Sequence, residues 1–284
     1  MRKEIAGKRF DEERSLYNLT KADVLDCVFA GPADGESVLK EARDVYLENC
    51  DFSLRYPLWH VEKFHVHDSR MDELTRAAIW YAKDGKITDS DLGGIKAVRE
   101  CRNITIQNCK INSTEFGWKC DGITLDDSAI SSEYLFLDSK NVKLENVEMK
   151  GKYSFQYMEN LEIRNCCLDT KDAFWHSKNV TVIDSVIKGE YLAWYSENLH
   201  LIRCTVIGTQ PLCYCKGLVL EDCKMIGCDL SFENSEVNAT VTGSVDSVKN
   251  PAAGSVIADS IGQIIQDEFA WNHGPVEIKI RSHT

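Results

Sequence analysis

One pattern returns every 19 residues along most of this chain, and it constrains the fold more than any other feature. Each copy starts with Asn or another turn residue, has apolar residues one and three positions later, and then carries Asn or Asp followed by Cys or Ser. The start recurs without a break at Asn103, Gly122, Asn141, Asn160, Asn179, Asn198, Gly217 and Glu236. A fixed period near 20 residues with β-type alternation predicts a solenoid, in which each repeat is one coil.

The start of each coil is counted here as position 0. Apolar residues at positions 1 and 3, such as Val180 and Val182, predict a strand with one face inward. Position 5 predicts a sharp bend, because Asn and Asp tolerate left-handed backbone and form local hydrogen bonds. Their side chains are also expected to bond from coil to coil. Position 5 holds Asn49, Asp68, Asp89, Asn108, Asp127, Asn146, Asn165, Asp184 and Asp222, with Arg203 as an exception.

A third strand is expected from position 12 to position 17, with its odd positions inward. Five of the six tryptophans share position 15, once an insertion is allowed before one of them: Trp59, Trp80, Trp118, Trp175 and Trp194. The periodicity favours an aromatic stack inside the core. The alternative is an exposed stripe on which sugars stack.

Three strands and three turns per coil predict an all-β fold, a right-handed single-stranded parallel β-helix. We expect about eleven coils of about 19 residues in one domain, residues 1–284. Residues 1–24 are expected to form an N-terminal cap, residues 25–245 the coils, and residues 246–284 a C-terminal capping segment, because open coils expose unpaired edges.

Composition and charge exclude several kinds of partner. The formal net charge of −12 and the absence of any basic run argue against nucleic acid and against an anionic membrane surface. No apolar stretch reaches the roughly 20 residues that span a bilayer, and no secretory signal is visible at the N-terminus.

The twelve cysteines follow the repeat rather than a metal-binding spacing. Position 6 exchanges Cys with Ser, which indicates a small buried side chain, and we expect free thiols, no zinc site and a reducing, cytoplasmic compartment. Position 6 holds Cys50, Cys109, Cys166, Cys204 and Cys223, alternating with Ser69, Ser90, Ser128 and Ser185.

The even positions of the third strand are expected to face solvent and to form an aromatic binding face. This face is predicted to contain Tyr134, Tyr153, Tyr157, Asp172, Tyr191, Tyr195 and Tyr214, with Phe136, Phe155 and Phe174 at position 14. Its ligand is an oligosaccharide, or its cover is a second copy of the chain or the C-terminal segment through Phe269, Trp271, Asn272 and His273. These alternatives stay open at this point.

The Asn ladder, the three strands per coil and the Cys/Ser column resemble the right-handed β-helices of the pectin-lyase-like superfamily. The copies Asn103–Ile111 and Asn160–Leu168 also resemble a group of uncharacterised bacterial proteins within it. The resemblance implies an outer face that binds acidic polysaccharides and, in a lyase, Ca²⁺ as cofactor; otherwise no cofactor is expected. The catalytic signatures of the superfamily are incomplete. Asp126–Asp127 falls on the bend, and Asn272–His273–Gly274 and Ile278–Lys279–Ile280–Arg281 do not reproduce the hydrolase motifs.

Two functions follow, from different classes. The first is a non-catalytic solenoid that binds a carbohydrate or a protein partner with its aromatic face. The second is a polysaccharide-active enzyme, a lyase or glycoside hydrolase acting on acidic glycans. For an enzyme, position 16 supplies the candidate catalytic residues Lys119, Asp138 and His176, because a carboxylate and an imidazole across a sugar-width gap suit acid and base chemistry.

Overall fold

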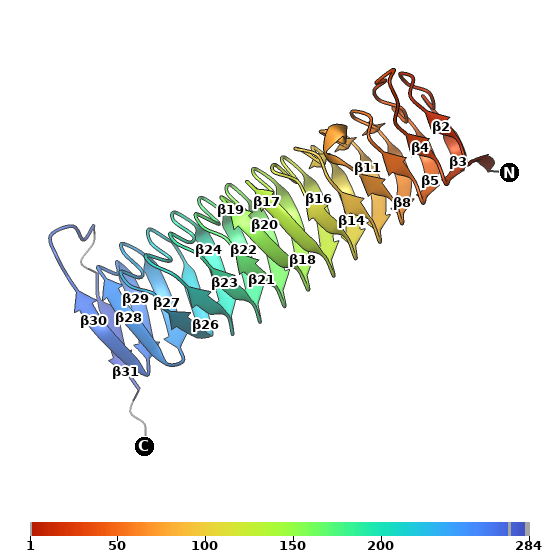
Figure 1. Ribbon diagram of the computed structural model, residues 1–284. Helices are drawn as coiled ribbons and strands as arrows, with labels where there is room; N and C mark the ends of the chain where they lie inside the picture. Colours follow the sequence, from red (N-terminus) through yellow and green to blue (C-terminus); the bar gives the residue numbers. More distant parts are fainter. Residues whose placement is uncertain (1, 272–273, 282–284) are drawn as a thin grey trace. The chain divides into compact units, whose positions relative to one another are not determined.

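The computed structural model describes residues 2–271 and 274–281, and they form an all-β parallel solenoid, as predicted. The chain divides into two compact units, Met1–Lys143 and Leu144–Thr284. Within each unit, strands of successive coils lie side by side (Figure 1). The single domain expected from the repeat stays a prediction. Among the described residues, no helix combines the length and apolar character needed to cross a membrane.

The first unit has two long parallel sheets. Neighbouring strands pair with residues one coil apart, as Ile104 does with Ile123. One sheet contains β1 (Lys3–Ala6), β3 (Thr20–Leu25), β5 (Arg43–Glu48), β8 (Glu62–His67), β11 (Lys83–Thr88), β14 (Arg102–Gln107) and β16 (Asp121–Asp126). The other contains β2 (Arg9–Phe10), β4 (Val28–Phe29), β6 (Asp51–Phe52), β9 (Arg70–Met71), β12 (Asp91–Leu92), β15 (Lys110–Asn112) and β17 (Ala129–Glu133).

The second unit repeats this arrangement, and Leu161 pairs with Val180 in the same register. One set of strands is β20 (Glu159–Arg164), β22 (Lys178–Ile183), β24 (Glu197–Ile202), β26 (Leu218–Ile226), β27 (Glu236–Val241), β29 (Ala253–Ala258) and β31 (Val276–Ile280). The other is β19 (Glu148–Lys152), β21 (Cys167–Asp169), β23 (Val186–Lys188), β25 (Thr205–Ile207), β28 (Ser244–Lys249) and β30 (Ser260–Ile265). β18 (Lys140–Glu145) contains the division between the units.

The described residues make about fifteen coils rather than about eleven. Residues 3–25 and 253–280, placed in capping segments by the sequence, contribute strands that pair in register with the coils. The spacing hid them. Ala22 pairs with Val45, 23 residues away, and Gly254 pairs with Val276, 22 residues away. Insertions of this kind break a search for a strict 19-residue step, although the coil itself continues.

The third side of the coil differs from the predicted strand. Among the described residues it forms short strands only at β7 (Leu58–Trp59), β10 (Ile79–Trp80) and β13 (Val98–Arg99), and a 3-10 helix, η1 (Glu73–Thr75), lies in one insertion. Later coils instead have left-handed backbone at positions 12, 14 and 16, with φ of 57°, 60° and 56° at Tyr153, Phe155 and Tyr157. Coils remain bonded here, since Tyr157 N donates to Trp175 O at 2.9 Å.

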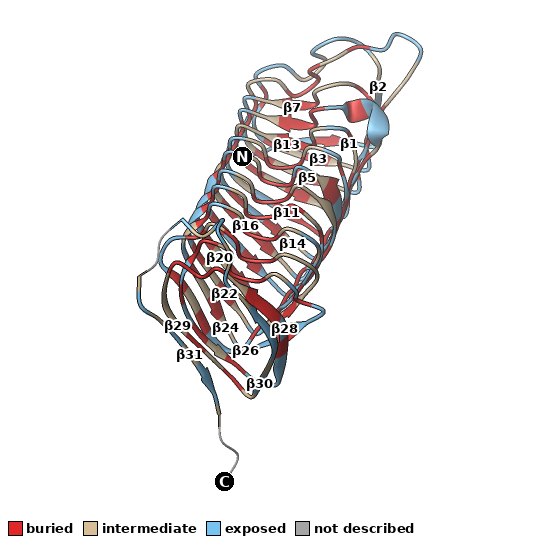
Figure 2. Ribbon diagram, turned by 90° about the vertical axis from the view of Figure 1, so that its left-hand side faces the viewer, coloured by how far each residue is buried: buried red, intermediate tan, exposed pale blue. Residues whose placement is uncertain are grey.

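This backbone corrects which side chains point inward. In a strand, positions 13, 15 and 17 would share one face. Here a left-handed residue turns the chain at every second step, so Phe136, Phe155 and Phe174 at position 14 are fully buried instead of facing solvent. The tryptophans at position 15 are only half-buried, so the predicted internal tryptophan stack is wrong. In Figure 2 the buried residues follow the inner faces of the strands.

The bend and the Cys/Ser column are confirmed. Position 5 is left-handed, with φ of 54° at Asn108, and Asn108 Nδ2 donates to Asp89 Oδ1 at 2.6 Å. Arg203 takes the same conformation and forms two hydrogen bonds with Asp184. At position 6 the Cys109 thiol donates to the carbonyl of Gln107, two residues back, and its amide donates to the hydroxyl at position 6 of the next coil. Either a thiol or a hydroxyl meets these demands.

Candidate functional site

Four aromatic rings stack in a row on the second unit, and we call them the aromatic ladder: Tyr157, His176, Tyr195 and Tyr214. All occupy position 16 of successive coils. Neighbouring ring centroids lie 5.1, 5.1 and 4.9 Å apart, and neighbouring planes are inclined by 8°, 7° and 13°. The coil repeat therefore places four residues, each 19 apart in sequence, in face-to-face contact.

A second row of rings supports the ladder from beside it. Trp175 and Trp194 stack with centroids 5.4 Å apart and planes inclined by 3°. Their indole N–H groups donate to the carbonyls of Tyr191 and Gln210, at 2.6 and 2.9 Å, in the following coil. Each tryptophan is therefore fixed by a ring contact and a hydrogen bond, which holds the adjoining position 16 in register.

The ladder presents ring edges to solvent. Tyr157 and Tyr195 are 55% and 40% exposed, yet the faces of the inner rings are covered by their neighbours. What remains accessible along the row is a line of phenol hydroxyl and imidazole N–H groups, at the spacing of the coils. This geometry suits hydrogen bonding along an extended ligand better than the stacking of sugars on ring faces.

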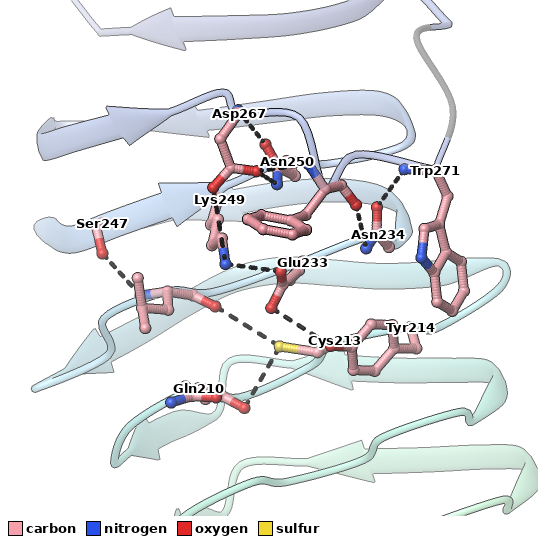
Figure 3. Close-up of polar contacts among 12 residues, drawn as sticks. Gln210, Cys213, Tyr214, Glu233, Asn234, Ser247, Lys249, Asn250, Asp267 and Trp271 are labelled. Atoms are coloured by element: carbon pink, nitrogen blue, oxygen red, sulfur yellow. Dashed lines mark hydrogen bonds and ion pairs between the residues drawn. The ribbon is translucent and has the colours of Figure 1, made fainter.

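The C-terminal segment covers one end of the ladder only. The Trp271 ring packs on Tyr214 with centroids 5.1 Å apart (Figure 3). Asn234 holds this segment by accepting a hydrogen bond from Trp271 N at 2.8 Å, and Asp267 accepts one from Asn250 Nδ2 at 2.6 Å. Asn272 and His273, the other residues of the predicted cover, lie outside the described residues.

A polar cluster adjoins this end of the ladder. Lys249 Nζ lies 2.8 Å from Glu233 Oε1 and 4.0 Å from Asp267 Oδ2. The hydrogen bond with Glu233 raises the pKa of Lys249. Burial, followed by the charge of Glu233, raises the pKa of Tyr214 to about 12, so its hydroxyl remains a hydrogen-bond donor near neutral pH.

The other predicted face residues differ in accessibility. Tyr134 is exposed and belongs to the first unit, whereas Tyr153 and Tyr191 are half-buried in the second. Tyr191 packs edge-on against Trp194 at 5.4 Å. Asp172 is buried, and burial raises its pKa. The structure thus brings Tyr157, His176, Tyr195 and Tyr214 together, while position 12 forms a less accessible row.

The predicted catalytic residues fall in different units. Lys119 and Asp138 are exposed on the first unit, and His176 lies in the second with Tyr157 and Tyr195 on its two ring faces. Their catalytic role stays a prediction. Within the described residues, no group of three or more His, Cys, Asp and Glu side chains is arranged to hold a metal ion.

The sequence interpretation missed a polar cluster on the first unit. His65 Nε2 and His67 Nδ1 each lie 3.0 Å from Thr88 Oγ1, and His67 Nδ1 is also 3.2 Å from Asp89 Oδ2. A shallow depression opens beside them, lined also by Tyr46 and Lys86 among other residues. The His-x-His spacing on β8 was the available signal, because residues two apart on a strand share a face.

Fold and site together define a parallel β-helix protein with an exposed aromatic ladder. The chain belongs to a family described as proteins of unknown function, DUF3737, whose sequence profile matches residues 3–279. The predicted resemblance to a family of unknown function is thereby confirmed. Comparison with curated proteins finds no similar sequence.

Solved structures with a similar fold include proteins of the pectin-lyase-like β-helix class. The surface adhesin PfbA of Streptococcus pneumoniae has a TM-score of 0.41 and 6% identity, over 94% of this chain and 85% of that one. The A-module of the mannuronan C-5 epimerase AlgE4 of Azotobacter vinelandii has a TM-score of 0.31 and 10% identity, over 98% and 89%. The tailspike protein of E. coli bacteriophage HK620 has a TM-score of 0.35 and 8% identity, over 96% and 58%. Similarity at this level carries no functional conclusion.

Proposed function

We propose that the aromatic ladder binds an extended, hydroxyl-rich carbohydrate without chemically changing it. One observation carries the proposal: four rings on one exposed row repeat at 4.9–5.1 Å. An extended polysaccharide advances by a similar distance per sugar. Each sugar can therefore meet one rung, exchanging hydrogen bonds with a phenol hydroxyl or an imidazole nitrogen.

The charges around the ladder favour a neutral glycan over an acidic one. The exposed residues two positions beyond the rungs alternate in sign, and Lys178 forms an ion pair with Glu197 at 3.3 Å. No unbalanced basic row follows the ladder among the described residues. With a formal net charge of −12 on the chain, a polyuronate would be repelled rather than attracted.

Calorimetric titration of the chain with oligosaccharides tests this proposal. The panel contains neutral hexasaccharides (cello-, xylo- and malto-oligosaccharides) and an acidic oligogalacturonate, each with and without Ca²⁺. We expect binding of a neutral member, no dependence on Ca²⁺, and no new reducing ends or unsaturated uronates after long incubation. Turnover of the acidic glycan would contradict the proposal and favour the polysaccharide-active enzyme. Absence of any binding would leave a protein partner as the ligand of the ladder.

We also propose a reducing, cytoplasmic location. All twelve cysteines are free thiols, and eleven of them are buried in the coils. Alkylation of freshly lysed cells without reductant, read by mass spectrometry after unfolding, tests this. Twelve modified thiols are expected, and a disulfide pair would contradict the proposal.

A further inference from the structure

The second unit ends in a strand with one unpaired edge. β31 pairs in parallel with β29, with Ile278 beside Val256, and the described residues give it no other strand partner. Arg281 N donates to Ala258 O in β29 at 2.8 Å. Backbone groups alternate sides along a strand, so those of Glu277 and Lys279 also face β29. The N–H and C=O groups of Ile278 and Ile280 therefore point toward the free edge.

The apolar column above the core is also uncovered at this end. Ile280 lies beside the fully buried Ala258 but is itself 60% exposed. In the other sheet, Ile264 of β30 lies beside the fully buried Val248 and is 49% exposed. Figure 1 shows β30 and β31 as the last strands of this unit. An open strand edge together with exposed apolar residues is a surface suited to pairing with another chain.

We propose that this edge binds a second copy of the chain, by antiparallel pairing of β31 with its counterpart about a two-fold axis at Ile278. The strand reads alike in both directions: apolar, acidic, apolar, basic, apolar in Val276, Glu277, Ile278, Lys279 and Ile280. Antiparallel pairing centred on Ile278 sets Glu277 opposite Lys279 of the second copy, and Lys279 opposite its Glu277. One strand thus supplies both halves of an isologous contact.

The hydrogen-bond register agrees with this pairing. Ile278 meets Ile278 of the second copy as a hydrogen-bonded pair, using the groups that point to the free edge. Glu277 and Lys279 then form the non-hydrogen-bonded pairs, in which side chains approach most closely. Within one chain Glu277 Oε1 and Lys279 Nζ lie 2.6 Å apart and both side chains are exposed. Such a surface pair can exchange for the intermolecular one at little cost.

The opposite edge does not have this symmetry. β1 pairs only with β3 among the described residues, and its sequence is Lys3, Glu4, Ile5 and Ala6. Antiparallel self-pairing there would set Lys3 opposite Ala6 and Glu4 opposite Ile5, without charge complementarity. The C-terminal edge is therefore the end that selects a second copy.

Charge reversal tests this pairing, with sedimentation velocity of the full chain as the measurement. The wild type is expected to dimerise with concentration. Glu277→Lys and Lys279→Glu each convert two attractive cross-strand pairs into two repulsive ones and weaken dimerisation roughly tenfold or more. The double variant Glu277→Lys/Lys279→Glu restores the wild-type dimer, and an equal mixture of the two single variants forms heterodimers. Circular dichroism of each variant confirms that the fold is retained.

Three results would overturn the proposal. The first is a wild-type chain that stays monomeric at its highest soluble concentration. The second is a dimer that both single variants retain, or that the double variant fails to restore. The third is open-ended assembly with concentration, which indicates head-to-tail stacking rather than a two-fold contact. A dimer that dissolves with Tyr157→Lys and withstands both charge reversals would place the interface on the aromatic ladder instead.

Discussion

The imidazole of His176 lies face to face with the phenol ring of Tyr195, with centroids 5.1 Å apart and planes inclined by 7°. These residues are 19 positions apart in sequence, and the coil alone makes them neighbours. Tyr157 covers the other face of the imidazole at the same distance. His176 therefore joins two tyrosines into one continuous row, and the predictions below begin with that row.

Removing one hydroxyl from the ladder is expected to weaken glycan binding without disturbing the stack. Tyr195→Phe keeps the ring but loses one hydrogen bond, worth about 0.5–1.5 kcal/mol. We expect the Kd for the neutral hexasaccharide to rise roughly 2- to 10-fold in calorimetry. Tyr17→Phe is the matched control, since Tyr17 is 54% exposed and lies outside the ladder. Equal affinity in the two variants would contradict hydrogen bonding by the ladder.

Truncating position 14 is expected to destabilise the fold far more than truncating position 16. Phe155 is fully buried and stacks on Phe174 at 5.1 Å, so Phe155→Ala should cost about 3–5 kcal/mol. Tyr157→Ala, two residues away and largely exposed, should cost about 1 kcal/mol or less. Guanidinium unfolding followed by circular dichroism compares them. Similar midpoints would mean that position 14 does not face the core.

The thiols are expected to react in two groups. Cys167 is exposed, whereas the other eleven thiols are buried, and burial raises the pKa of several of them, including Cys109 and Cys50. Ellman's reagent should therefore modify one thiol rapidly in the folded chain and the rest only on unfolding. The variant Cys167→Ser should lack the rapid phase. Rapid modification of several thiols would show that position 6 is accessible.

Acidification is expected to destabilise the first unit through His65. Burial, with Lys86 and His67 adding to it, lowers the pKa of His65 below 6.5. Below that pH the unfolded chain binds a proton that the folded imidazole resists, so the free energy of unfolding falls as the pH drops. His65→Gln should lose this part of the difference between about pH 8 and about pH 5 in denaturant titrations. A wild-type fall no larger than that of the variant would contradict the assignment.

The sequence predicted the coil well where side-chain demands are simple. Position 5 needs a left-handed bend and position 6 a small hydrogen-bonding group, and Asn108 and Cys109 meet both demands visibly. Position 16 was correctly expected on the surface. Such positions are readable because few residue types satisfy them.

The third side could not be predicted for the opposite reason. Its left-handed residues include Tyr153, Phe155 and His176, which have no intrinsic preference for positive φ. Hydrogen bonds from the neighbouring coils hold the backbone there, so local sequence carries no signal, and the pattern resembles a strand. The cluster of Glu233, Lys249 and Asp267 was missed because the coil spacing changes after β27, which removes the column in which neighbours are recognised.

Affinity measured against oligosaccharide length tests the central claim most directly. A ladder with one rung per coil should bind a neutral glycan more tightly with each added sugar until all four rungs are engaged, after which affinity should level off. Tyr195→Ser should remove the gain from the added sugars while leaving disaccharide binding almost unchanged. An affinity that is already complete with a disaccharide, or a length dependence that survives Tyr195→Ser, would contradict binding along the ladder.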